Sequence, residues 1–142
     1  MTPEEVFRTL VHGVAAGRYA GLPDLYAEQT DVRHPMHPAR PGPLRSRAEL
    51  RAHFGDGGPD PAVRFEAVDI VVHQTADPEV IVGEFAYAGT AAATGETFHV
   101  PCVFVVRVRD GEIVESRDYV DHAAMAQVRE RLAEPGATDA AS

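Results

Sequence analysis

The stretch Thr97–Val120, TFHVPCVFVVRVRDGEIVESRDYV, contains the strongest indication of fold in this chain. Asp110-Gly111 is a residue pair typical of a two-residue turn between antiparallel strands. The segments on both sides are rich in β-branched and aromatic residues, which favour strands. The stretch therefore predicts a β-hairpin made of strand 97–109 and strand 112–120.

The predicted turn also sets which side chains share a face of the sheet. It opposes Arg109 to Glu112, and an uninterrupted ladder then opposes Val103 to Asp118. The face shared with Asp118 would carry His99, Pro101, Val103, Val105, Val114 and Ser116. The other face would carry Cys102, Phe104, Val106, Glu115, Arg117 and Tyr119.

This register places the Asp118 carboxyl among valines. Apolar surroundings disfavour the charged form and would raise the pKa of Asp118 towards the range useful for acid–base catalysis. The alternative is an ordinary strand-end carboxylate that pairs in solvent with Arg117 or another arginine.

The remaining segments predict helices and strands in an α+β order. We expect strands over 30–36, 63–74 and 80–88, and helices over 3–16, 22–26, 46–54 and 121–132. Helices packed on one face of a curved, mostly antiparallel sheet fit this order. We expect one domain over residues 1–133 and a flexible tail over 134–142.

Composition narrows the range of partners. The chain has 142 residues and a formal net charge of −9, which disfavours nucleic acid and anionic membrane as main partners. No apolar run approaches the roughly 20 residues of a membrane span. The N-terminus, MTPEEVF, lacks the positive charge of a secretory signal, so we expect a cytoplasmic protein. Cys102 is the single cysteine, which excludes an intrachain disulfide and a cysteine-based zinc site.

The segment DVRHPMH, Asp31–His37, contains two histidines that could serve chemistry. His34 has an ordinary pKa of about 6.5 and could act as base or acid, with a neighbouring Asp118 raising its pKa. Residues three apart on a strand point to opposite faces, which disfavours a metal chelate of His34 with His37. We therefore expect no metal. A strand-end histidine that bonds only to backbone or solvent is the alternative.

Four segments in order resemble the SnoaL-like and ketosteroid-isomerase-like members of the nuclear transport factor 2-like superfamily. They are Leu25-Tyr26-Ala27, Asp31–Pro35, Arg47–Arg51 and DGEIVESRDYVD at Asp110–Asp121. The resemblance extends from Val6 to about Leu132. It implies a cone-shaped fold in which a bent sheet wraps helices around one deep apolar cavity, commonly in a homodimer.

The resemblance also implies site residues. His34 precedes Pro35 at the position where ketosteroid isomerases have their catalytic aspartate. Asp118 matches the acid of an R-[DE]-[YF] motif that lines the cavity in limonene-1,2-epoxide hydrolases and phenazine-biosynthesis A/B proteins. Both comparisons place these two side chains in the cavity.

Other positions depart from those families. Leu10 and Val103 stand where the isomerases have oxyanion-binding groups, and Phe85 and Tyr87 stand where the hydrolases have an arginine and an aspartate. Steroid-type isomerisation and epoxide hydrolysis by the known residues are therefore disfavoured.

The sequence thus predicts a cofactor-free acid–base enzyme acting on a small apolar carbonyl compound by cyclisation, isomerisation or dehydration. The catalytic residues would be His34 and Asp118, and the substrate-binding residues Tyr87, His99, Val103, Val105 and Leu10. A non-catalytic, ligand-binding homodimer is the alternative. The dimer would form through the outer face that carries Phe104, Val106 and Tyr119.

Overall fold

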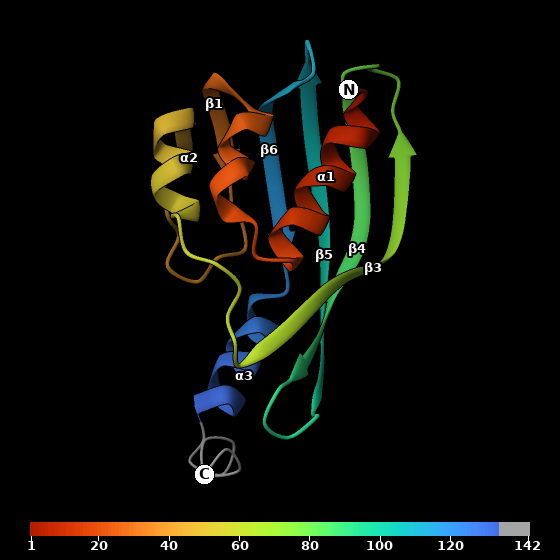
Figure 1. Cartoon of the computed structure of the whole chain (residues 1–142). Helices are drawn as coiled ribbons and strands as arrows, with labels where there is room; N and C mark the ends of the chain where they lie inside the picture. Colours follow the sequence, from red (N-terminus) through yellow and green to blue (C-terminus); the bar gives the residue numbers. More distant parts are fainter. Residues whose placement is uncertain (134–142) are drawn as a thin grey trace.

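The computed structural model describes residues 1–133, and its centre is one curved sheet of six strands (Figure 1). The strands are β1 (Tyr26–Arg33), β2 (Leu44–Ser46), β3 (Val63–Gln74), β4 (Val80–Ala91), β5 (Thr97–Arg109) and β6 (Glu112–Val120). Their order across the sheet is β2-β1-β6-β5-β4-β3, and among the described strands only β1 and β6 pair in parallel. The predicted α+β fold with a curved, mostly antiparallel sheet is confirmed.

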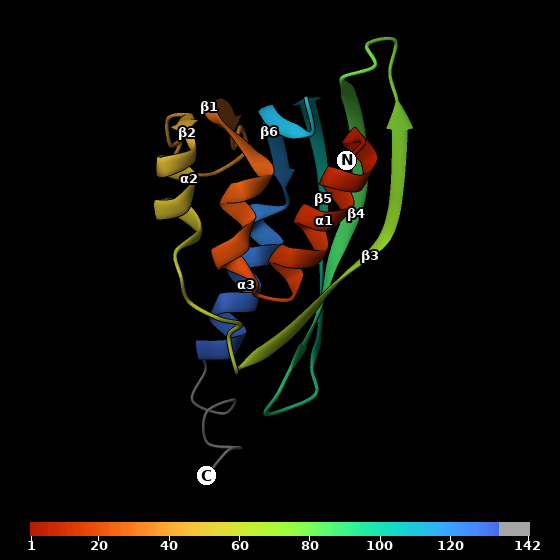
Figure 2. The same cartoon turned by 45° about the horizontal axis from the view of Figure 1, so that its top comes forward.

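The helices lie against one face of this sheet, called here the inner face (Figures 1 and 2). They are α1 (Pro3–Ala15), the 3₁₀ helix η1 (Tyr19–Leu25), α2 (Arg47–Phe54) and α3 (His122–Ala133). Helix α1 contacts β3, β4 and β5. Helix α1 begins with a capping box in which Thr2 and Glu5 satisfy each other's backbone N–H groups.

The N-terminal part of the sheet differs from the prediction in two ways. The strand expected from Thr30 begins at Tyr26, because it continues directly from η1 and pairs in parallel with β6. Strand β2 was not predicted, since its three residues are too few to show an alternating pattern. The expected tail, residues 134–142, lies outside the described residues.

Phe7 holds α1 against the sheet. Its side chain is fully buried and makes edge contacts with Phe85 and Phe104, with ring centroids 5.7 and 6.2 Å apart. Gly83 lies directly beneath the ring, and a Cβ atom there would be 2.2 Å from Phe7 Cζ. The close approach of helix and sheet therefore requires glycine at this position.

The β5–β6 hairpin contains a bulge that the sequence reasoning did not anticipate. Arg109 pairs with Glu112 and Val108 with Ile113 as predicted, but the register then shifts by one residue on β6. Asp118 consequently pairs with Phe104 rather than with Val103. A one-residue shift moves every later side chain to the opposite face of the sheet.

Because of this bulge, several side chains of β5 lie on the opposite face of the sheet from the one predicted. Cys102, Phe104 and Val106 are buried in the inner core, whereas Val103, Val105 and His99 lie on the outer face. An unbroken ladder would have kept Ile113 on the same face as Glu115 and Arg117. With the bulge, both charged side chains are exposed while Ile113 stays buried.

The corrected register predicts an unreactive Cys102. Its side chain is buried, and burial raises the pKa of the thiol to about 12. Since the thiolate is the reactive form, a thiol reagent at pH 8 should react with the folded protein about 10³-fold more slowly than with the unfolded chain. Absorbance of the released chromophore with and without denaturant measures both rates. Fast, stoichiometric labelling of Cys102 in the folded protein would contradict the bulged register and favour the uninterrupted one.

The predicted dimer surface was wrong in part, because Phe104 and Val106 belong to the core and only Tyr119 faces outward. A homodimer itself stays a prediction, as does a cytoplasmic location. Within residues 1–133, no helix combines the length and the apolar character needed to cross a membrane.

Candidate active site

A pocket of about 260 Å³ lies between the inner face of the sheet and the helices. Its apolar wall includes Leu10, Val32, Leu50, Phe104 and Met125. Leu10 was predicted to line the cavity, and the structure places it there. Asp118 of β6 and His34, which directly follows β1, place two titratable groups in this wall.

The parallel pairing of β1 with β6 brings Asp118 and His34 together. Arg33 pairs with Arg117, so the next residue on each strand lies beside the other. His34 Nε2 is 3.7 Å from Asp118 Oδ2, and the Ser116 hydroxyl donates a hydrogen bond to Asp118 Oδ1. Asp118 is only 6% exposed. The predicted meeting of these two side chains at one pocket is therefore present.

Burial moves the two pKa values in opposite directions. It raises the pKa of the Asp118 carboxyl to about 7, although the Ser116 hydrogen bond acts in the other direction. It lowers the pKa of His34 to about 4, and repulsion from neighbouring imidazoles adds to this effect. The prediction that Asp118 raises the pKa of His34 was therefore wrong. Near pH 7, His34 is neutral and Asp118 is present in both protonation states.

Two tyrosines complete the buried part of the pocket. Tyr87, a predicted site residue, and Tyr26 both line it and are nearly fully buried. Burial raises the pKa of each phenol well above its usual value, and the charge of Asp118 raises it further. Both hydroxyls therefore stay protonated and can donate hydrogen bonds. Tyr26 was missed as a site residue, although it is part of the Leu25-Tyr26-Ala27 segment.

Three histidines that the sequence reasoning did not assign to the site also line the pocket. His37 follows β1 in a loop, His53 is on α2, and His122 begins α3. The ring centroids of His34 and His53 are 5.3 Å apart, and those of His37 and His122 are 4.7 Å apart. No sequence spacing could have grouped them, because the three elements are joined only by folding. No three His, Cys, Asp or Glu side chains within residues 1–133 are arranged to hold a metal ion.

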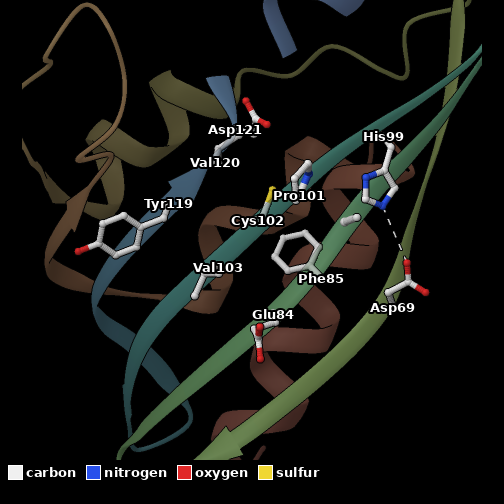
Figure 3. Close-up of a pocket in the computed structure, with 11 residues that line it drawn as sticks. Asp69, Glu84, Phe85, His99, Pro101, Cys102, Val103, Tyr119, Val120 and Asp121 are labelled. Carbon is white, nitrogen blue, oxygen red and sulfur yellow. Dashed lines mark ion pairs between the residues drawn. The ribbon is translucent and has the colours of Figure 1, made fainter. Parts of the chain in front are cut away.

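The other predicted substrate-binding residues do not reach this pocket. Figure 3 shows His99 and Val103 on the outer face, around a separate and more open hollow of about 410 Å³. His99 Nε2 lies 3.9 Å from Asp69 Oδ2, and both side chains are mostly exposed. Val105 lies on the same outer face. The predicted common pocket for His99, Val103, Val105 and Asp118 was wrong because it assumed an unbulged hairpin.

A family model and one known protein both match the sequence of this chain. Residues 7–116 match the family model of the SnoaL-like domain. An uncharacterized PhzA/B-like protein of Pseudomonas aeruginosa is 31% identical over 116 residues, which cover 78% of this chain and 79% of that protein.

Solved structures share the fold. A candidate isomerase of Bacillus subtilis superposes with a TM-score of 0.74 at 20% identity, over 88% of this chain and 90% of that one. A candidate polyketide cyclase of Xanthomonas campestris gives 0.66 at 20% identity, over 89% and 96%. A Catenulispora acidiphila protein of ketosteroid isomerase-like fold, in complex with trimethylamine, gives 0.62 at 18% identity, over 84% and 86%.

Proposed function

Since this chain belongs to the SnoaL-like domain family, as its sequence motifs predicted, we propose that it is a cofactor-free acid–base enzyme. Its substrate is a small, largely apolar carbonyl compound, and the reaction is a cyclisation, isomerisation or dehydration. The observation that supports this most is the buried Asp118 carboxyl beside neutral His34 in an apolar-walled pocket. A carboxyl with a pKa of about 7 can take up and release a proton near neutral pH.

The proposed step is proton transfer at the carbon next to the carbonyl. The Asp118 carboxylate takes the proton, the C–H electron pair moves into an enolate, and the protonated Asp118 then returns the proton to the same or another atom. The Tyr26 and Tyr87 hydroxyls are candidate donors to the enolate oxygen, where charge develops. His34 positions the Asp118 carboxylate. His34 is not proposed as the base, although the sequence allowed that role, because a histidine with a pKa of about 4 is a weak base.

The competing function is ligand binding without turnover. The trimethylamine complex of the Catenulispora acidiphila protein shows that a protein of this fold holds a small molecule. Hydrogen exchange separates the two functions without the natural substrate. An acid–base enzyme should accelerate exchange of the α-hydrogens of a small ketone, such as butyrophenone, in D₂O, as followed by ¹H NMR. A binding protein should leave the exchange rate unchanged.

The pH dependence of this exchange is a prediction of its own. The rate should rise with pH through an inflection near 7, because the base form of Asp118 predominates above its pKa. Ser116→Ala removes the hydrogen bond that lowers the pKa of Asp118, so the inflection should move up by about 1 pH unit. Rates measured from pH 5 to pH 9 locate the inflection. Ser116→Thr keeps the hydroxyl and is the matched control; equal inflections in the two variants would contradict the assignment.

A further inference from the structure

Polar groups in the pocket are arranged in a gradient from the buried end to the rim. Asp118 is at the buried end, whereas His53 and Arg129 are exposed at the rim, with His37 and His122 partly buried between them. Four of these five groups are basic or can become so. In a chain with a net charge of −9, this rim is a local exception. It offers donors and potential positive charge to whatever occupies the pocket.

The hydrogen bond made by His37 indicates what this ring can bind. Its Nδ1 accepts a hydrogen bond from the backbone N–H of Ala39, at 3.0 Å. A neutral imidazole that accepts at Nδ1 carries its proton on Nε2 and is a donor there. His37 Nε2 therefore suits an oxygen acceptor and not a metal ion, which needs a free lone pair.

His122 provides a second, independent indication. Its Nε2 is the one buried side-chain nitrogen or oxygen without a hydrogen-bond partner in the part of the chain that the structure describes. A buried polar atom without a partner is costly, and such atoms are uncommon in folded proteins. His122 lines the same pocket, and its ring contacts that of His37. An acceptor oxygen of a ligand placed beside this pair of rings could satisfy both nitrogens.

We propose that the ligand of this pocket carries a carboxylate, which binds at the histidine rim formed by His37, His53, His122 and Arg129. The inference rests on the proposed function, because it names the chemical class of that substrate. The carboxylate at the rim leaves the apolar body of the molecule to fill the pocket, with its carbonyl towards Asp118. The substrate is thus an apolar oxo acid and not a neutral ketone.

Binding of a carboxylate is coupled to proton uptake. The groups that face the rim are His34, Asp118, Asp121, Tyr26 and Tyr87 from the strands and their ends, and His37, His53, His122 and Arg129 from the loop and helices. Burial lowers the pKa values of His53 and His122, and repulsion from His37 adds to both effects, so these two imidazoles are largely neutral near pH 7. A bound anion favours the protonated imidazoles. Affinity therefore rises as pH falls, by up to about tenfold per pH unit for each proton taken up.

The test uses two probes of matched size, 3-benzoylpropanoate and its neutral amide. Isothermal titration calorimetry gives Kd for each with wild-type protein at pH 6, 7 and 8, in buffers of different ionisation enthalpy. The acid should bind about tenfold more tightly than the amide, the usual scale of one charge-assisted hydrogen bond. Its Kd should fall towards pH 6, and the dependence of the heat on buffer should report proton uptake. The amide should show neither effect.

Matched histidine variants locate the effect. His53→Asn and His122→Asn should each weaken binding of the acid and reduce proton uptake, while His99→Asn on the outer face should change nothing. Equal affinity for acid and amide, no measurable binding of either, or proton uptake that persists in both rim variants would overturn the inference. Proton exchange of a neutral ketone that depends on Asp118 would then still support the acid–base function. Conversely, carboxylate binding without any exchange activity would overturn the function alone.

Discussion

Asp118→Asn is expected to lower the rate of α-proton exchange, and turnover of the natural substrate, by about 10²–10⁴-fold, the usual contribution of a general acid–base group. Asparagine keeps the volume and can still accept from the Ser116 hydroxyl, but it cannot take up a proton at neutral pH. The exchange rate in D₂O measures the loss. Retained activity in this variant would rule out the site assignment even though the fold is correct.

Stability should change in the opposite direction to activity. The pKa of Asp118 in the folded protein, about 7, is above its ordinary value of 3.8, so the ionised carboxylate is disfavoured by folding. Above pH 7 the folded wild type must bury this charge, and Asp118→Asn removes that cost. The thermal midpoint of the variant should therefore exceed that of wild type at pH 8. The difference should shrink as pH falls through 7 and Asp118 becomes protonated.

His34 tests whether the pair acts as one unit. His34→Ala should also slow exchange, since the carboxylate loses the group that positions it. The effect of Asp118→Asn should be largely lost in the His34→Ala background, because residues that act together are not additive. Independent, multiplying losses would show that the two side chains serve different steps. His99→Ala is the matched control and should leave the rate unchanged.

Phe7→Ala is expected to lower the free energy of unfolding by about 3–5 kcal/mol, the range measured for loss of a large buried aromatic side chain. The ring is fully buried and forms the contact between α1 and the sheet. Its loss would leave a cavity between α1 and the rings of Phe85 and Phe104. Urea denaturation followed by circular dichroism measures the change. Val71→Ala, at an apolar side chain that is 50% exposed, should stay within about 0.5 kcal/mol of wild type.

Gly83 tests the same contact from the side of the sheet. A Cβ atom there would collide with the Phe7 ring, so Gly83→Ala should cost about 1–3 kcal/mol through overpacking. In the Phe7→Ala background the ring is gone and the cost should largely vanish, which a double-mutant cycle detects. If the cost of Gly83→Ala is the same in both backgrounds, the close approach of α1 is not its cause.

The fold, and the placement of His34 and Asp118 in the site, could be predicted because the sequence patterns that indicate them are short and local. The turn at Asp110-Gly111, the capping box at Thr2 and the alternating strands each depend on neighbouring residues, and together they predict the hairpin, α1 and the sheet. The placement of His34 and Asp118 at one cavity came from matching short segments to a family. Both kinds of inference survive small errors in strand register.

The sheet face that each side chain occupies and the pKa shifts of the site residues could not be predicted from such local patterns. The bulge in β6 depends on which face of the hairpin α1 and the rest of the core cover, and a shift of one residue moved Val103 and Val105 out of the pocket. His37, His53 and His122 approach one another only because a loop and two helices converge at one rim. The predicted effect of Asp118 on His34 had the wrong sign, because burial and repulsion by neighbouring imidazoles outweigh one carboxyl that is itself often protonated. Local sequence patterns are thus enough to predict most of the helices and strands and to identify the reactive groups. The face that each group occupies and the extent of its desolvation depend on contacts between residues far apart in the chain, so they follow only from the folded arrangement.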